Sequence, residues 1–241
     1  MSSPSSYPSQ ALEYFYPGLL MRKPPASVFE LGVASRSKAI SLFSMPDQPL
    51  QVLAVVGSLN PNSVTRTVIL QVADRLRADG CLVDVLDFES EPLPLYNPDS
   101  AYEAPGFDAL QARVERADVY VLGTPDYHGS ISGAMKNFLD HFWREFAGKL
   151  FATIVASHEK GLTVTDQLRT VARQCYAWTL PYGVSFGEPE DVREGRIASD
   201  ALNERLEMFV HDVRVYGTVL AGQRHADLAG SEPGFMARHR K

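Results

Sequence analysis

The sequence has too little cysteine for a disulfide scaffold or a cysteine-rich zinc site. Its 241 residues include only two cysteines, Cys81 and Cys175, which lie far apart and belong to no CxxC pair. Disulfide scaffolds and structural zinc sites need several closely spaced cysteines, and this chain offers neither pattern. The same scarcity is typical of a reducing compartment, so a cytoplasmic location is expected.

The chain also lacks an excess of positive charge and a long apolar run. Lys and Arg total 23 against 29 Asp and Glu, which gives a formal net charge of −6. Nucleic-acid binding needs a concentrated positive face, so this balance argues against a DNA or RNA partner. No stretch approaches about 18 consecutive apolar residues, so no membrane-spanning helix and no membrane partner are predicted. The hydrophobic fraction of 45% is nevertheless sufficient for a globular core.

The two ends of the chain differ in composition from its middle. Residues 1–46 are rich in Ser and Pro, carry few acidic side chains and show no sustained periodicity. They lack the basic start and apolar run of a secretory signal, so we expect a flexible extension. A transit-like segment and a true start at Met45 remain open. Residues 222–241 are polar and contain glycine, so a tail is expected there, with the folded domain over 47–221.

Strand-like and helix-like patterns alternate from residue 51 onward. Apolar runs typical of strands occupy 51–57, 81–87, 119–124, 150–157 and 181–186. Helical spacing is found at 63–79, 107–117, 132–146, 165–178 and 198–220. Parallel strands need such crossovers, and strands that are apolar throughout are typical of a sheet covered on both faces. The pattern predicts an α/β fold with a doubly wound, five-stranded parallel sheet.

The functional residues of such a fold are expected in particular loops. A doubly wound sheet binds its ligand beyond the carboxyl ends of its strands, where the strand order reverses. With the order 2-1-3-4-5, the loops after strands one, three and four would meet at one crevice. These loops are 57–63, 124–131 and 157–161.

The first loop has hydroxyl and amide side chains at the start of a helix. Its sequence is GSLNPNSVTR, and the polar residues in question are Ser58, Asn60, Ser63 and Thr65. Free main-chain N–H groups and the helix dipole suit this position to a phosphate monoester. The loop lacks the glycines of a dinucleotide fingerprint and the Lys-Ser/Thr ending of a nucleoside-triphosphate loop. The alternative is that Ser63 serves only as a helix cap.

The second loop combines an aromatic ring, an imidazole and a turn. It contains Pro125, Asp126, Tyr127, His128, Gly129 and Ser130. Such side chains and main-chain amides around a Pro/Gly turn suit a flat heteroaromatic ring with hydrogen-bonding edges. The alternative is that Tyr127 and His128 are exposed loop residues without a partner.

These two loops resemble one known family. GSLNPNSVTR after the first strand and GTPDYHGSISGAMKNFLDH after the third are similar to the NADPH-dependent FMN reductase family of flavodoxin-like flavoproteins. The resemblance covers residues 51–186 and implies a flavodoxin-like fold, bound FMN and NADPH as hydride donor. It implies that the polar residues of the first loop hold the FMN phosphate. It also implies that the six residues 125–130 line the isoalloxazine ring.

Two positions depart from the family pattern. Asn60 stands where the family usually has arginine, and Arg66, one helical turn further on, is a candidate to compensate for it. The loop after the fourth strand reads SHEKG, with one glycine where the family has several. Ser157 and His158 would therefore meet the edge of the flavin ring with side chains.

We therefore expect an FMN-dependent oxidoreductase that passes hydride from NADPH through FMN to a flavin, quinone, azo or nitro acceptor. The flavin supplies the redox chemistry, so no catalytic side chain is predicted, and no histidine spacing predicts a metal site. By resemblance, the protein is expected to form a homodimer or homotetramer. Two alternatives remain open. One is an NAD(P)-binding Rossmann dehydrogenase, in which Asp87 would bind a ribose, and the other is a flavodoxin-like binding or regulatory module without turnover.

Overall fold

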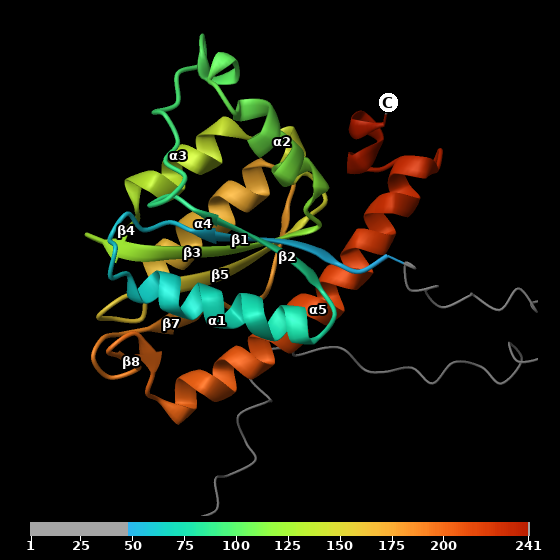
Figure 1. Cartoon of the computed structure of the whole chain (residues 1–241). Coiled ribbons are helices and arrows are strands. Elements are labelled where there is room, and N and C mark those ends of the chain that lie inside the picture. Colours follow the sequence, from blue (N-terminus) through green and yellow to red (C-terminus); the bar gives the residue numbers. More distant parts are fainter. Residues whose placement is uncertain (1–47, 241) are drawn as a thin grey trace, which may run out of the picture. The chain divides into compact units, whose positions relative to one another are not determined.

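A mostly parallel sheet lies at the centre of the structure, a computed structural model that describes residues 48–240 (Figure 1). Its main strands are β1 (Gln51–Val56), β2 (Leu82–Asp87), β3 (Val119–Tyr127) and β5 (Leu150–Ala156). They pair in parallel in the order β2-β1-β3-β5. Two short segments, β6 (Trp178–Thr179) and β7 (Val184–Phe186), both pair with β5 in place of a continuous fifth strand. The predicted order is confirmed, whereas the N-terminal extension predicted at 1–46 lies outside the described residues.

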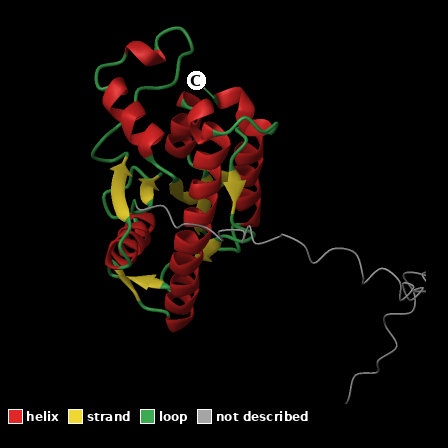
Figure 2. Cartoon of the chain, turned by 90° about the vertical axis from the view of Figure 1, so that its right-hand side faces the viewer, coloured by secondary structure: helices red, strands yellow, loops and turns green. Residues whose placement is uncertain are grey.

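Helices cover both faces of this sheet (Figures 1 and 2). One face packs against α1 (Val64–Ala78) and α5 (Asp200–Ala229). The other packs against α2 (Phe107–Arg116), α3 (Gly133–His141) and α4 (Leu162–Gln174). The short elements are β4 (Ser130–Ile131), β8 (Val192–Arg193), β9 (Arg196–Ile197) and the 3-10 helices η2 (Ala101–Glu103), η3 (Arg144–Phe146) and η4 (Phe235–His239). This arrangement is the doubly wound fold that the alternating pattern predicts.

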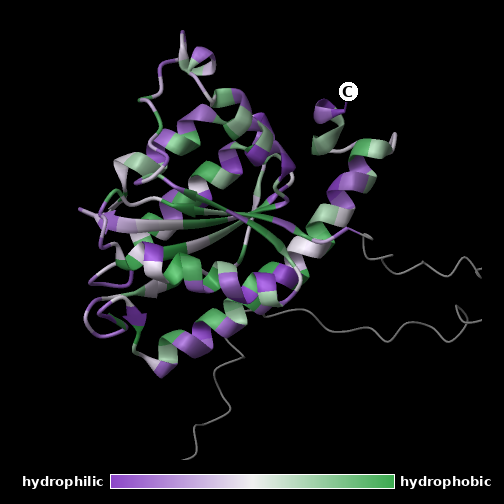
Figure 3. Cartoon of the chain, viewed as in Figure 1, coloured by the Kyte–Doolittle hydropathy of each residue, from purple (hydrophilic) through white to green (hydrophobic). Residues whose placement is uncertain are grey.

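The apolar strands are explained by two hydrophobic cores, one on each face. In β3, Val119 and Val121 belong to the core beneath α1 and α5, while Tyr120 and Leu122 belong to the opposite core. Successive side chains of a strand point to opposite faces, so a strand buried on both sides has no polar positions. Figure 3 shows mostly hydrophobic residues along the central strands, whereas hydrophobic and hydrophilic residues alternate along the outer helices. Each buried aliphatic side chain contributes about 1.5–3 kcal/mol to folding.

Helices α3 and α4 end earlier than predicted, at His141 and Gln174 where the sequence suggested 146 and 178. Helix α4 stops at Gln174 because Tyr176 adopts a left-handed conformation, with φ 58°, and Trp178 then enters β6. Helix α3 likewise ends at His141 and is followed by η3. Helical periodicity alone does not reveal these stops, because the residues directly beyond the two helices, Phe142 and Cys175, are still apolar.

The prediction of a polar tail at 222–241 is wrong for most of that segment. Helix α5 continues to Ala229, and η4 packs back on the domain with the Met236 side chain only 1% exposed. Arg224 Nε donates a hydrogen bond of 2.9 Å to the carbonyl oxygen of Ala147. Polar composition was a poor guide because residues 222–229 form the last turns of α5, where polar side chains face the solvent. In residues 48–240, no helix has the length and apolar character needed to span a membrane.

Candidate functional site

A cavity of about 270 Å³ lies where the loops after β1, β3 and β5 meet. Nine of the twelve predicted site residues line it: Ser58, Asn60, Ser63, Thr65, Pro125, Asp126, Tyr127, Ser157 and His158. Two further cavities, of about 1070 and 470 Å³, adjoin it and share Ser157 and His158. The loops therefore form the crevice expected at the carboxyl ends of the strands.

Close packing and internal hydrogen bonds fix the shape of the first loop. Gly57 approaches β3 so closely that an added Cβ would lie 2.8 Å from the carbonyl oxygen of Gly123. Ser58 Oγ accepts a hydrogen bond from the Asn60 amide at 3.3 Å, and Asn60 Oδ1 accepts one from the Asn62 amide at 2.9 Å. Ser63 caps α1 by accepting from the Arg66 amide at 3.2 Å. These bonds fix the main chain around the start of the helix.

Several main-chain donors of this loop have no acceptor within residues 48–240. They are the N–H groups of Ser58, Leu59, Ser63, Val64 and Thr65. Buried polar groups are normally paired, and Ser58, Ser63 and Thr65 are all buried. Free donors at the positive end of a helix form an anion site, so this loop fits a phosphate group.

Arg66 does not compensate for Asn60 as the sequence suggested. Its guanidinium forms an ion pair with both carboxylate oxygens of Asp87, and Nη1 donates to the carbonyl oxygens of Asn60 and Pro61 at 2.9 and 2.8 Å. The hydrogen bond to Asp87 raises the pKa of Arg66. Among the described residues that line the cavity, there is no Lys or Arg. Arg66 thus holds the loop in position from outside the cavity. A phosphate bound in the cavity would depend on N–H and hydroxyl donors.

The same ion pair argues against the Rossmann alternative. That interpretation needs the carboxylate of Asp87 to be free for a ribose hydroxyl, whereas both of its oxygens accept hydrogen bonds from Arg66. Asp87 therefore stabilises the first loop through Arg66.

The second loop is a tight β-hairpin. Strand β3 runs on to Tyr127, three residues beyond its predicted end, and pairs antiparallel with β4. The two residues between the strands, His128 and Gly129, have φ of 58° and 74°. Positive φ at both positions is the mark of a type I′ turn, and histidine adopts it more readily than most residues. His128 therefore occupies the exposed tip of the hairpin, outside the cavity.

Hydrogen bonds hold the hairpin against its neighbours. Asp126 Oδ1 accepts from the Gly129 amide at 2.8 Å, and Oδ2 accepts from Ser157 Oγ at 2.9 Å. Gln167 of α4 accepts from Ser130 Oγ at 3.1 Å and donates to the Gly129 carbonyl at 3.3 Å. Ser130 is therefore turned toward α4 and away from the cavity, and Gly129 lines the adjoining cavity instead. Asp126 links the second and third loops.

The far wall of the crevice comes from a segment that the sequence analysis did not assign to the site. Phe186, the last residue of β7, and the two residues that follow it, Gly187 and Glu188, line the cavity. Gly187 lies so close to the third loop that an added Cβ would be 3.3 Å from the Ser157 carbonyl oxygen. They lie at and directly after the end of the fifth predicted strand, so the rule that ligands bind beyond strand ends could have found them.

Comparison with known proteins agrees with this geometry. The family model for NADPH-dependent FMN reductase matches residues 50–191. An NADPH azoreductase from Bacillus sp. (strain OY1-2) is 28% identical over 168 residues, which are 68% of this chain and 88% of that protein. An FMN-dependent NADPH-azoreductase from Staphylococcus aureus (strain USA300) is 30% identical over 176 residues, which are 67% of this chain and 92% of that protein.

Solved structures support the fold. An NADH:FMN oxidoreductase in its apo form superposes with a TM-score of 0.59 at 16% identity, covering 69% of this chain and 89% of that one. The flavoenzyme NAD(P)H:(acceptor) oxidoreductase from Paracoccus denitrificans superposes with a TM-score of 0.56 at 22% identity, covering 72% and 98%. The family model spans more than half of the chain and includes all three loops of the crevice. The chain belongs to the NADPH-dependent FMN reductase family, as an oxidoreductase that uses bound FMN and takes its electrons from NAD(P)H.

Proposed function

We propose that the loop from Ser58 to Thr65 holds the FMN phosphate. The observation that carries this proposal is the set of N–H groups around the start of α1 that have no acceptor within the described chain. The hydroxyl groups of Ser58, Ser63 and Thr65 line the same cavity and can donate further hydrogen bonds. Asn60, with its carbonyl held by Arg66, keeps the loop in this shape.

The isoalloxazine ring is proposed to lie along the second and third loops. Pro125 is buried and Tyr127 is 53% exposed, so the hairpin offers one apolar wall that is open to solvent. Ser157 and His158 lie across the cavity and offer hydrogen-bonding groups to the ring edge. Bound FMN supplies hydride transfer, while the chain binds it, orients it and leaves one ring face accessible.

The second substrate is proposed to be an azo compound, a quinone, a nitro compound or a free flavin. Each of these is flat, and the open crevice beside Tyr127 admits a flat molecule without closure of a lid. The two relatives described above are named azoreductases, which favours the azo class. The exposed ring of Tyr127 and the His128 tip would limit which acceptors stack.

Spectroscopy and turnover test this function together. The purified protein should show flavin absorbance in stoichiometric amount, and anaerobic NADPH should bleach it. Adding an azo dye or a quinone to the reduced protein should restore the absorbance, and the relative rates identify the preferred class. A protein that takes up no FMN would refute the cofactor assignment. A flavin that NADPH reduces but no member of these classes reoxidises would refute the acceptor proposal alone.

The assembly and the location are proposed on separate grounds. Apolar side chains that surround the crevice are exposed, among them Leu59, Tyr127 and Leu162, and exposed apolar patches are common at subunit interfaces. We therefore propose a homodimer or homotetramer, which light scattering on the purified protein would test. Cys81 and Cys175 are buried free thiols, which supports the predicted cytoplasmic location, and cell fractionation would test it.

A further inference from the structure

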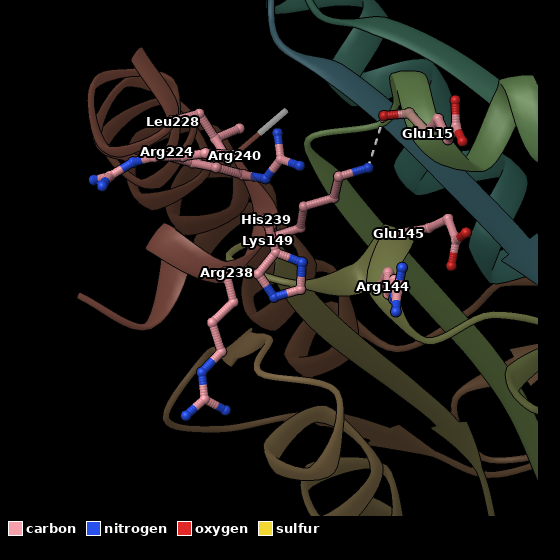
Figure 4. A pocket seen from close by; sticks show the side chains of 9 residues that line it. All are labelled: Glu115, Arg144, Glu145, Lys149, Arg224, Leu228, Arg238, His239 and Arg240. Atoms are coloured by element: carbon pink, nitrogen blue, oxygen red, sulfur yellow. Dashed lines mark hydrogen bonds between the residues drawn. The ribbon is translucent and has the colours of Figure 1, made fainter. Parts of the chain in front are cut away.

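A second large cavity, of about 740 Å³, lies at the opposite end of the sheet from the crevice. Figure 4 shows that its side chains come from the end of α5 and from η4 and its neighbour Arg240 on one side, and from α2, η3 and the residue before β5 on the other. Lys149 directly precedes β5 and Glu115 belongs to the helix before β3, whereas the loops of the crevice follow these strands. The cavity is therefore separate from the proposed flavin site.

The lining of this cavity is strongly basic. It includes five basic side chains, Arg144, Lys149, Arg224, Arg238 and Arg240, against two acidic ones, Glu115 and Glu145. Within residues 48–240, none of the five lies within 4.0 Å of a carboxylate oxygen. The protein as a whole carries a formal charge of −6, so this concentration of positive charge is local.

Neutral carbonyl groups orient two of the guanidiniums without cancelling their charge. Arg224 donates to the Ala147 carbonyl oxygen at 2.9 Å, and Arg240 donates to those of Asp227 and Glu232 at 2.8 and 2.6 Å. Arg144 and Arg238 are exposed and donate no side-chain hydrogen bond to another described residue. Two fixed and two free guanidiniums thus face one cavity.

Lys149 is buried at the base of the cavity, close to this positive charge. It is 2% exposed, and its ammonium donates to the carbonyl oxygens of Val114 and Glu115 at 2.9 and 2.7 Å. Burial and then the charge of Arg224 lower the pKa of Lys149 to about 7. Burial and the charges of Arg224, Arg144 and Arg238 also lower the pKa of His239, which lines the same cavity. An anion placed here would relieve the repulsion.

The wall of the cavity is built by close packing. Gly148 has a φ of 75°, and an added Cβ would lie 2.8 Å from the sulfur of Met236 and 3.2 Å from Cδ of Arg224. Glycine accommodates both the conformation and this contact without displacing either side chain. The buried Met236 in turn anchors η4, which carries Arg238. The basic side chains are therefore held around the cavity by a packed element and do not belong to a frayed terminus.

We propose that this cavity binds a small molecule that carries several phosphate groups, independently of the flavin chemistry. Arginine forks match phosphate oxygens in two-pronged hydrogen bonds, and four of them in one cavity suit more than one phosphate. A concave site of this volume suits a small molecule, whereas a membrane surface or a nucleic acid would need an extended basic face. The ligand class is thus an organic or inorganic polyphosphate.

Calorimetric titration of the FMN-loaded protein with tripolyphosphate tests this proposal. Arg144→Gln and Arg238→Gln should each weaken binding about tenfold or more, since each loses a charge-assisted bond to phosphate. Neither side chain bonds to another described residue, so both variants should fold normally. Arg173→Gln is the matched control, because Arg173 is an exposed arginine on α4 that lies outside the cavity lining. It should change the affinity less than about twofold.

Several outcomes would overturn the proposal. One is the absence of binding at physiological ionic strength, and another is an equal loss in Arg173→Gln. Unchanged affinity in both Arg144→Gln and Arg238→Gln would place the probe outside this cavity. Binding to anionic phospholipid vesicles or single-stranded RNA without binding to tripolyphosphate would show that the basic face serves a macromolecular surface.

Discussion

Replacing Ser63 with Ala separates phosphate recognition from the general stability of α1. The Ser63 hydroxyl caps the helix through the Arg66 amide at 3.2 Å, and it also lines the cavity. Loss of the cap should lower the free energy of unfolding by about 1 kcal/mol. Loss of a hydrogen bond to a charged phosphate should cost a further 1.5–3 kcal/mol of FMN binding, roughly a ten- to hundredfold weaker affinity.

Two ligands and one control variant distinguish these effects. Riboflavin has the same ring system without the phosphate, so its affinity for Ser63→Ala should change little. Ser199 caps α5 through the Leu202 amide at 3.2 Å and lies outside the cavity lining, so Ser199→Ala should lose similar stability and keep its FMN affinity. Fluorescence titration of the apoprotein with each flavin gives the affinities, and urea unfolding gives the stability. Equal losses for FMN and riboflavin in Ser63→Ala, or a comparable FMN loss in Ser199→Ala, would refute the phosphate assignment.

Burial lowers the pKa of Lys149 to about 7 in the native state, so between about pH 7 and 9 the unfolded chain binds more protons at this residue. Stability of the natural protein relative to Lys149→Met should therefore rise by about 2 kcal/mol over that range, and a constant difference in urea unfolding would show a normally charged Lys149. His128→Asn should keep the type I′ turn and reduce flavin at an unchanged rate in stopped-flow measurements, while acceptor preference shifts by about 1–2 kcal/mol. A thousandfold slower reduction would instead indicate an acid–base role for His128. Donor and acceptor are expected to use the crevice in turn, so initial-rate plots should be parallel, and intersecting lines would indicate that both bind together.

The sheet could be predicted from the sequence because its signal is local and repeated. The runs that became β1, β3 and β5 are apolar at nearly every position, and only a strand covered on both faces requires that pattern. Once the strand order is assumed, the convergence of three loops follows from topology alone. Nine site residues consequently line the cavity as the sequence analysis expected.

What could not be predicted depends on side-chain direction and on long-range contacts. The sequence offered Arg66 as a phosphate ligand, but its partner Asp87 comes from β2, and no local pattern reports that pairing. The resemblance implied that His128 and Gly129 line the ring, but they form the tip of the hairpin outside this cavity, and turn residues in a sequence reveal a bend without its direction. The C-terminal segment appeared to be a tail because its anchoring residue, Met236, is a single buried side chain among polar ones.

A phosphate group would meet a different physical environment at each end of the sheet. At the carboxyl ends, the first loop offers main-chain N–H groups and hydroxyls at a helix start, and the cavity lining there includes no Lys or Arg among the described residues. At the amino ends, Arg144, Arg224 and Arg238 provide full charges. Fixed dipoles act only at short range, whereas an excess of full charge attracts anions over about a Debye length and is screened by salt. FMN binding should therefore depend weakly on ionic strength, and a multivalent anion at the basic cavity should respond to it strongly.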